Sequence, residues 1–93
     1  MTIRYQLDFR KGVLREIERM PGHLRQRVKR IIQQLNVDPR PAIAEELHDD
    51  LQGLYKIKLG DWRVVYRVDD TILVVTVIKV GQKSGPEFYK LLR

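Results

Sequence analysis

The sequence predicts an α+β domain in which a mostly antiparallel sheet of about four strands is packed by an N-terminal helical hairpin. Apolar residues recur with the helical period of about 3.6 between residues 9 and 35, and with the strand period of two from residue 54 onward. A helical half followed by a strand half is typical of the α+β class. With 93 residues the chain is long enough for one domain, and we expect residues 1–93 to form it.

The first half of the chain predicts one strand and two helices. Ile3–Leu7 alternates like a strand, and Asp8 is a candidate N-cap for the first helix. Pro21-Gly22 ends that helix, and the two prolines in residues 36–41 end the second. Because the break between the helices is short, we expect them to form an antiparallel hairpin. Their apolar stripes are Phe9, Val13, Ile17 and Met20, and then Leu24, Val28, Ile31, Ile32 and Leu35.

The second half predicts three strands and a short final helix. The expected strands are Leu54–Leu59, Trp62–Val68 and Ile72–Val80. Gly60-Asp61 connects the first two as a two-residue turn with glycine first, which is typical of type II′. Ala42–Leu51 is ambiguous, and we expect a helical turn there at most. Pro86–Leu92 is expected to be a short helix with proline in its first turn.

The composition limits the function classes. Cysteine is absent, which excludes disulfides, thiolate chemistry and cysteine-ligated zinc. Residues 1–12 contain no apolar h-region, and the apolar run Ile72–Ile78 is too short to cross a bilayer, so we expect a soluble, cytoplasmic protein. The net charge of +6 and the pI near 9.9 favour a polyanionic partner, most commonly nucleic acid. A membrane surface or an acidic protein fits the charge equally well.

The first predicted hairpin concentrates positive charge on one face of the sheet. If Gly60-Asp61 is the turn, Lys58 lies opposite Arg63, and alternation places Lys56 on the same face. Like charges directly opposite each other destabilise a hairpin by up to about 1 kcal/mol, so the crowding suggests an anion-binding patch. The alternative is that these long side chains splay into water and only cover the sheet. The other face is the expected core side: Tyr55, Ile57, Leu59, Trp62, Val64 and Tyr66.

Two residues near the C-terminus are candidates for the same patch. Lys83 follows the last predicted strand, and Tyr89 follows it within the final helix. An aromatic ring beside cations suits stacking on an unpaired RNA base, although core packing is the alternative for Tyr89. His23 and His48 have no spacing that suggests a metal site or an acid–base pair, so we expect neither a metal nor a cofactor. We interpret the acidic residues Glu45, Glu46, Asp49 and Asp50 as a solvated stretch.

The segment between Leu47 and Tyr66 resembles the signature hairpin of the RelE/ParE toxin superfamily. The resembling residues are Leu47, Leu51-Gln52-Gly53-Leu54-Tyr55-Lys56-Ile57-Lys58 and Gly60-Asp61-Trp62-Arg63-Val64-Val65-Tyr66. The resemblance extends over nearly the whole chain and implies a toxin of a type II toxin–antitoxin module. Arg63 and Tyr66 belong to the pattern that RNA-cutting and gyrase-inhibiting members share. The pair Lys56-x-Lys58, with Lys83 and Tyr89, resembles the RNA-cutting branch.

The RelE resemblance implies a metal-independent endoribonuclease that enters the ribosomal A site, cuts messenger RNA and inhibits translation. In that chemistry the 2′-hydroxyl attacks the adjacent phosphate and leaves a 2′,3′-cyclic phosphate and a 5′-hydroxyl. The implied roles are Lys56 or Lys58 as base, Arg63 as transition-state clamp, Lys83 as acid and Tyr89 as stacking partner of the base at the cut. Which lysine is the base stays open. The family commonly has arginine where this chain has Lys83, and lysine keeps the charge but loses the planar fork.

The partners implied by the resemblance are a cognate antitoxin protein and a 70S-type ribosome with messenger RNA in its A site, without a membrane or a small-molecule cofactor. Two other functions stay open. One is a ParE-like toxin, which inhibits gyrase by binding and is not an enzyme. The other is an RNA- or ribosome-binding module whose catalytic set has decayed.

Overall fold

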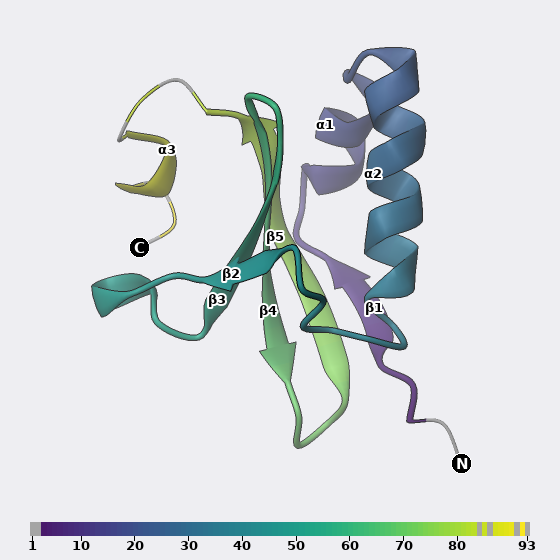
Figure 1. Cartoon of the computed structure of the whole chain (residues 1–93), viewed down its shortest axis with the longest axis vertical. Coiled ribbons are helices and arrows are strands. Elements are labelled where there is room, and N and C mark those ends of the chain that lie inside the picture. The colour runs from purple at the N-terminus through teal and green to yellow at the C-terminus, as the bar shows by residue number, and fades with distance from the viewer. Residues whose placement is uncertain (1–2, 84, 86, 91, 93) are drawn as a thin grey trace.

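The α+β architecture is confirmed in the computed structural model, which describes residues 3–83, 85, 87–90 and 92. Figure 1 shows helices α1 and α2 on one side of a twisted sheet and the short helix α3 on the other side. No helix within these residues is long and apolar enough to cross a membrane. The elements in chain order are β1 (Gln6–Phe9), α1 (Val13–Glu18), α2 (Gly22–Gln34), β2 (Ala44–Glu46), the 3-10 helix η1 (Asp49–Leu51), β3 (Leu54–Leu59), β4 (Trp62–Asp69), β5 (Val74–Gln82) and α3 (Glu87–Lys90).

The sheet has five strands in the order β1-β5-β4-β3-β2, one more than expected. Only the β1–β5 pair is parallel among these described strands. The additional strand, β2, lies within Ala42–Leu51, where at most a helical turn was expected; the turn, η1, follows β2. A strand of three residues carries too little periodicity to be recognised, and β2 is defined by its pairing with Tyr55–Ile57.

The prediction of the N-terminal elements was wrong in its boundaries. The strand is Gln6–Phe9 instead of Ile3–Leu7, because Gln6–Phe9 pairs in parallel with Val74–Val77 of β5 and keeps the chain extended. Asp8 therefore lies in the strand and does not cap a helix. Helix α1 begins at Val13, after Gly12 with φ +91°, a left-handed conformation that favours glycine. The break at Pro21-Gly22 is confirmed, and α2 begins directly after Pro21.

The β3–β4 hairpin has the predicted register, with Leu59 opposite Trp62 and Lys58 opposite Arg63. Gly60 has φ +61° while Asp61 stays outside the positive-φ region, as a type II′ turn requires. Strand β5 begins at Val74 instead of Ile72, because the Asp69 carboxylate accepts the backbone N–H groups of Thr71 and Ile72 in a turn. The predicted final helix is present as α3, and Pro86 lies outside the described residues.

The two faces of the sheet bury different groups of residues. The larger core lies between the sheet and helices α1 and α2, and it includes the predicted core face of the hairpin. A smaller cluster on the opposite face consists of Leu47, Val65 and Phe88, with Tyr89 packed against it. Helix α3 therefore lies over the face of the sheet that carries the charged residues of the hairpin.

Candidate functional site

The three cations of the β3–β4 hairpin lie on one face of the sheet, as predicted. Lys58 is directly opposite Arg63, and Lys56 is directly opposite Val65. The pairing of β4 with β5 adds Lys79, which lies opposite Val65, and places Gly81 opposite Arg63. Directly opposite residues share a face. Together with Lys83, which follows β5, these side chains form what we call the cationic face: Lys56, Lys58, Arg63, Lys79 and Lys83.

Helix α3 adds an aromatic ring to the cationic face. The Nζ atoms of Lys56 and Lys83 lie 5.6 Å and 5.7 Å from the centroid of the Tyr89 ring. Both distances are within the range of cation–π attraction, so the ring joins two lysines that are far apart in the sequence. The Tyr89 ring packs against the Phe88 cluster, as the core-packing interpretation expected, and it also contacts two of the cations. Its stacking on an RNA base stays a prediction.

The position of α3 depends on a glycine in β5. A Cβ atom at Gly81 would lie 3.3 Å from Cε2 of Phe88, closer than an ordinary contact. The backbone N–H of Lys83 donates to the carbonyl of Asp61 at 2.8 Å and fixes the start of the tail beside the hairpin turn. The sheet thus holds α3 through Phe88, which approaches Gly81 closely and is buried against Val65.

The guanidinium group of Arg63 forms hydrogen bonds within its own hairpin. Its Nη1 atom donates to the carbonyl oxygens of Gly60 and Trp62 at 2.7 Å and 2.9 Å. Its Nε atom and the hydroxyl of Tyr89 are buried without a hydrogen-bond partner among the described residues. A buried polar group without a partner costs about 1–3 kcal/mol, so both atoms favour a ligand or a movement of α3 that gives them partners.

Lys58 forms an ion pair that the sequence interpretation missed. Its Nζ atom lies 3.5 Å from Oε1 of Glu45. Glu45 belongs to β2 and is directly opposite Lys56, so an acidic side chain lies within the cationic face. Glu45 is exposed, as the interpretation of a solvated stretch expected, but its place in β2 and its ion pair with Lys58 were not predicted. Lys79 was also missed, although strand alternation toward Gly81 points to it.

The described residues contain no group of three His, Asp or Glu side chains that could hold a metal ion. His23 and His48 lie on separate elements, in α2 and just before η1, and both are exposed. What the cationic face offers is fixed positive charge, one carboxylate and a half-buried ring. In general, fixed positive charge is suited to binding a phosphodiester, and an aromatic ring is suited to stacking on an unpaired base.

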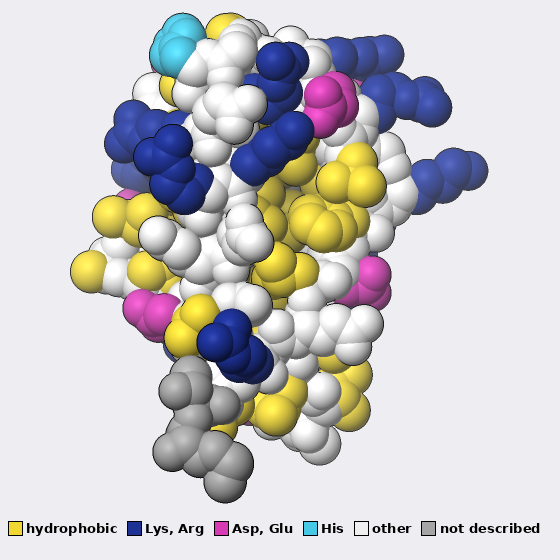
Figure 2. Space-filling model, turned by 90° about the vertical axis from the view of Figure 1, so that its right-hand side faces the viewer, with side chains coloured by type: hydrophobic (Ala, Val, Ile, Leu, Met, Phe, Trp, Pro, Cys, Tyr) yellow, Lys and Arg dark blue, Asp and Glu magenta, His cyan; other side chains and the backbone are white. Residues whose placement is uncertain are grey.

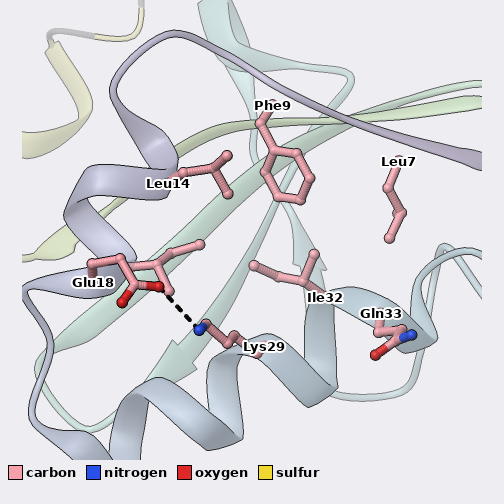
Figure 3. A pocket seen from close by; sticks show the side chains of 8 residues that line it. Leu7, Phe9, Leu14, Glu18, Lys29, Ile32 and Gln33 are labelled. Carbon is pink, nitrogen blue, oxygen red and sulfur yellow. Dashed lines mark ion pairs between the residues drawn. The ribbon is translucent and has the colours of Figure 1, made fainter.

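A concave region lies on the side of the sheet opposite the cationic face. It is a cavity of about 230 Å³ between β1, α1 and α2, lined mainly by apolar side chains, with the Glu18–Lys29 ion pair of 3.0 Å at its edge. Figure 3 shows Leu7, Phe9, Leu14 and Ile32 pointing into it. Figure 2 shows this side of the molecule, where Lys and Arg side chains gather around exposed apolar ones. This cavity carries no candidate catalytic residue.

Comparison with known proteins gives a consistent family. Residues 7–85 match the family model described as the ParE toxin of the type II toxin–antitoxin system parDE. The mRNA interferase toxin RelE of Escherichia coli is 33% identical over 87 residues, which cover 91% of this chain and 90% of that protein.

Solved structures agree with the sequence relatives. A mutant of the E. coli toxin RelE in the free state is 32% identical, with a TM-score of 0.75, and the match covers 94% of this chain and 92% of that one. The toxin chain in the intact E. coli RelBE toxin–antitoxin complex is 31% identical, with a TM-score of 0.72, over 87% of this chain and 99% of that one. The protein whose cationic face lies beneath α3 is therefore a RelE-type member of the RelE/ParE superfamily of type II toxins.

Proposed function

We propose that this toxin is a ribosome-dependent endoribonuclease that cuts messenger RNA in the A site and so inhibits translation. The observation that carries the proposal is the Tyr89 ring between Lys56 and Lys83 at the edge of the cationic face. This arrangement suits an RNA strand, whose base stacks on a ring while its phosphate meets the cations. The name mRNA interferase, which E. coli RelE carries, supports the same activity.

The proposed reaction is transphosphorylation within the RNA. The 2′-hydroxyl attacks the adjacent phosphorus, the bond to the 5′ oxygen breaks, and a 2′,3′-cyclic phosphate and a 5′-hydroxyl remain. Lys56, Lys58 and Arg63 stabilise the negative charge of the transition state, since preorganised charge is often the largest catalytic contribution. Lys83 protonates the leaving 5′ oxygen, and Tyr89 stacks on the base at the cut. Either hairpin lysine accepts the 2′-hydroxyl proton only in its neutral form.

The cationic face supports dependence on the ribosome. Arg63 donates to two backbone carbonyls of its own hairpin, and α3 covers part of the face. Without a histidine pair the acid–base equipment is weak, so the ribosome must position the message for attack. We expect the isolated protein to cut free RNA poorly. Cleavage of free RNA at the rate seen on ribosomes would overturn this part of the proposal.

The proposal includes a cognate antitoxin and a cytoplasmic location, where the ribosomes are. E. coli RelE is found in a complex with its antitoxin, and the net charge of +6 suits an acidic partner. Co-expression with the neighbouring gene, followed by affinity purification of the toxin, tests this partner. A toxin recovered alone at full toxicity would argue against it.

Primer extension on a defined message in a translating extract tests the activity. Wild-type protein is compared with the double variant Lys56→Ala/Arg63→Ala and with the control Arg4→Ala/Lys11→Ala, which removes the same charge outside the cationic face. We expect cuts within translated codons that need ribosomes, persist in the control and vanish in the double variant. An intact message in the presence of wild-type protein would refute the ribonuclease.

The description of the matching family favours one alternative, a ParE-like toxin that inhibits gyrase without cutting RNA. The process that stops first on expression distinguishes the two. Immediate loss of amino-acid incorporation supports the ribonuclease, whereas blocked replication with DNA-damage signalling supports gyrase. A chain that binds ribosomes but neither cuts RNA nor stops growth would be a decayed binding module.

A further inference from the structure

We propose that Lys79 binds the message phosphate that follows the cut on the 3′ side, and so forms a second phosphate subsite next to the one at Arg63. This inference rests on the proposed ribonuclease activity, which assigns no residue to that phosphate. It depends on the face of the sheet to which Lys79 points, on its unpaired charge and on its position relative to Arg63 and Lys83.

A β-bulge in β5 turns Lys79 toward the cationic face. Val65 and Tyr66 are consecutive in β4, but their partners in β5 are Lys79 and Val77, so Ile78 is an extra residue between the two pairs. Val77 is buried in the core on the helix side of the sheet, and strict alternation would turn Lys79 to that side as well. The extra residue reverses the alternation and brings Lys79 to the opposite face. Bulges beside active sites commonly redirect a side chain in this way.

The ammonium group of Lys79 is available to an anion. No carboxylate among the described side chains forms an ion pair with it, whereas Lys58 is paired with Glu45. The Lys79 Nζ atom lies 5.2 Å from the centroid of the Phe88 ring, a contact that provides no oxygen acceptor for its N–H groups. A phosphate oxygen is an acceptor that suits such a point charge.

Lys79 and Arg63 are placed to hold two consecutive phosphates. Arg63 lies opposite Gly81, and Lys79 lies opposite Val65, so the two cations are diagonal neighbours on adjacent strands, about 7–8 Å apart. Phe88 packs on Val65 and close to Gly81, the residues of the other diagonal, so its ring separates the two cations and one phosphate cannot contact both. A single ribose joins consecutive phosphates of RNA, and it spans a comparable distance.

The position of Lys83 gives the direction of the RNA strand. In the proposed reaction Lys83 protonates the leaving 5′ oxygen, which belongs to the nucleotide on the 3′ side of the cut. Lys83 directly follows β5, the strand that contains Lys79, whereas Lys56 and Lys58 belong to β3. The leaving nucleotide therefore lies toward β5, and its own 3′ phosphate is the one that meets Lys79.

The first test is single-turnover cleavage of a defined message on programmed ribosomes at increasing protein concentration. We expect Lys79→Met to raise the concentration that gives the half-maximal rate about tenfold, the factor that one charge-assisted hydrogen bond supplies, and to leave the maximal rate within about threefold of wild type. Lys79→Arg keeps the charge and should behave like the wild type. Arg67→Met is the matched control, because Arg67 is an exposed cation on the same face of β4, about 13 Å along the strand from Arg63. The control should leave the half-maximal concentration unchanged.

A neutral methylphosphonate in the message identifies the phosphate that Lys79 binds. Placed at the phosphate that follows the cut on the 3′ side, it should weaken the wild type about tenfold more than Lys79→Met, because the variant has already lost this contact. Placed at the phosphate on the 5′ side of the cut, it should weaken both proteins equally. Equal weakening at the 3′ position, or a difference at the 5′ position instead, overturns the inference.

The Phe88→Leu background separates phosphate binding from a role in holding α3. If Lys79 acts only through its contact with the Phe88 ring, Lys79→Met has no further effect once the ring is gone, and the inference fails. Phosphate binding predicts that Lys79→Met still raises the half-maximal concentration about tenfold in this background. Urea midpoints within error of each parent protein confirm that the variants fold. If Phe88→Leu does not fold, the methylphosphonate comparison decides alone.

The outcomes distinguish this inference from the proposed function. Wild-type cleavage with an unchanged half-maximal concentration in Lys79→Met leaves the ribonuclease standing and refutes the second subsite. Absence of cleavage by the wild-type protein refutes both. An equal rise in Lys79→Met and Arg67→Met indicates a general effect of positive charge on this face and overturns the assignment.

Discussion

Tyr66 is part of the hairpin pattern shared by the superfamily, yet its position predicts a role in stability and none in cleavage. Its side chain is fully buried on the helix side of the sheet, whereas Arg63, three residues earlier, lies on the cationic face. The Tyr66 hydroxyl donates to the carbonyl oxygen of Pro39 at 2.7 Å. Burial raises the pKa of Tyr66, so the phenol stays a neutral donor throughout the physiological range. The Tyr66 side chain therefore holds the loop after α2 against the sheet through this hydrogen bond.

Replacing Tyr66 by phenylalanine removes only this hydrogen bond. The ring keeps its stacking on Tyr55, whose centroid is 5.6 Å away. A net hydrogen bond is worth about 0.5–1.5 kcal/mol, and an unpaired buried carbonyl adds to the cost, so we expect a loss of about 1–2 kcal/mol. In a domain of this size that lowers the melting temperature by about 4–16 °C. Urea unfolding followed by circular dichroism measures the loss as a lower midpoint with an unchanged slope.

Tyr55→Phe is the matched control for Tyr66→Phe. The Tyr55 hydroxyl accepts a hydrogen bond from Nε of Arg40 at 2.8 Å on the surface, where water can replace the donor. We expect the midpoint to change much less than in Tyr66→Phe, and both variants to keep wild-type cleavage on ribosomes. Equal midpoints for Tyr66→Phe and the wild type would show that the bond to Pro39 does not form, and loss of cleavage at full stability would show that Tyr66 acts in the site.

Three further predictions concern charge, acid stability and the hairpin turn. Lys79→Ala is expected to weaken binding of single-stranded RNA and to reduce the slope of log K against log salt by about 0.7, whereas an unchanged slope would remove Lys79 from the binding surface. Arg40 and Tyr5 donate hydrogen bonds to the carboxylate of Asp70 and lower its pKa. The stability that these hydrogen bonds contribute is therefore present above about pH 4 and is lost as the pH falls toward the lowered pKa. Asp70→Asn should therefore lose stability at pH 7 and show a flatter acid limb in thermal melts between pH 2 and 7. In Gly60→Ala the added Cβ has no atom within 4 Å, but an alanine must then adopt φ +61°. We expect the free energy of unfolding in urea to fall by about 1–2 kcal/mol, and no change would mean that the turn relaxes.

The hairpin and the helical stripes could be predicted because their signals are local. The register of β3 and β4 follows from one two-residue turn, and this register alone brought Lys58 opposite Arg63. The apolar stripes of α1 and α2 likewise predicted the buried residues Val13, Ile17 and Val28. Errors appeared where a boundary depends on a partner far along the chain, as with β1, which is extended as far as Phe9 because it pairs with β5.

The candidate site was predicted only in part, for a similar physical reason. Lys56, Lys58 and Arg63 lie on one hairpin, so alternation was enough to group them. The arrangement of Lys83 and Tyr89 depends on where α3 packs, which the close approach of Phe88 to Gly81 determines. Glu45 enters the site through the short strand β2, whose existence depends on pairing and not on its own sequence.

The position of Glu45 also bears on how a cationic face can be tolerated. Lys58 and Arg63 are like charges directly opposite each other, an arrangement that destabilises a hairpin. Two features of the structure offset this repulsion: Lys58 pairs with Glu45 on its outer side, and Arg63 turns back to the carbonyl groups of Gly60 and Trp62. Both arrangements leave the cations in place without neutralising the face.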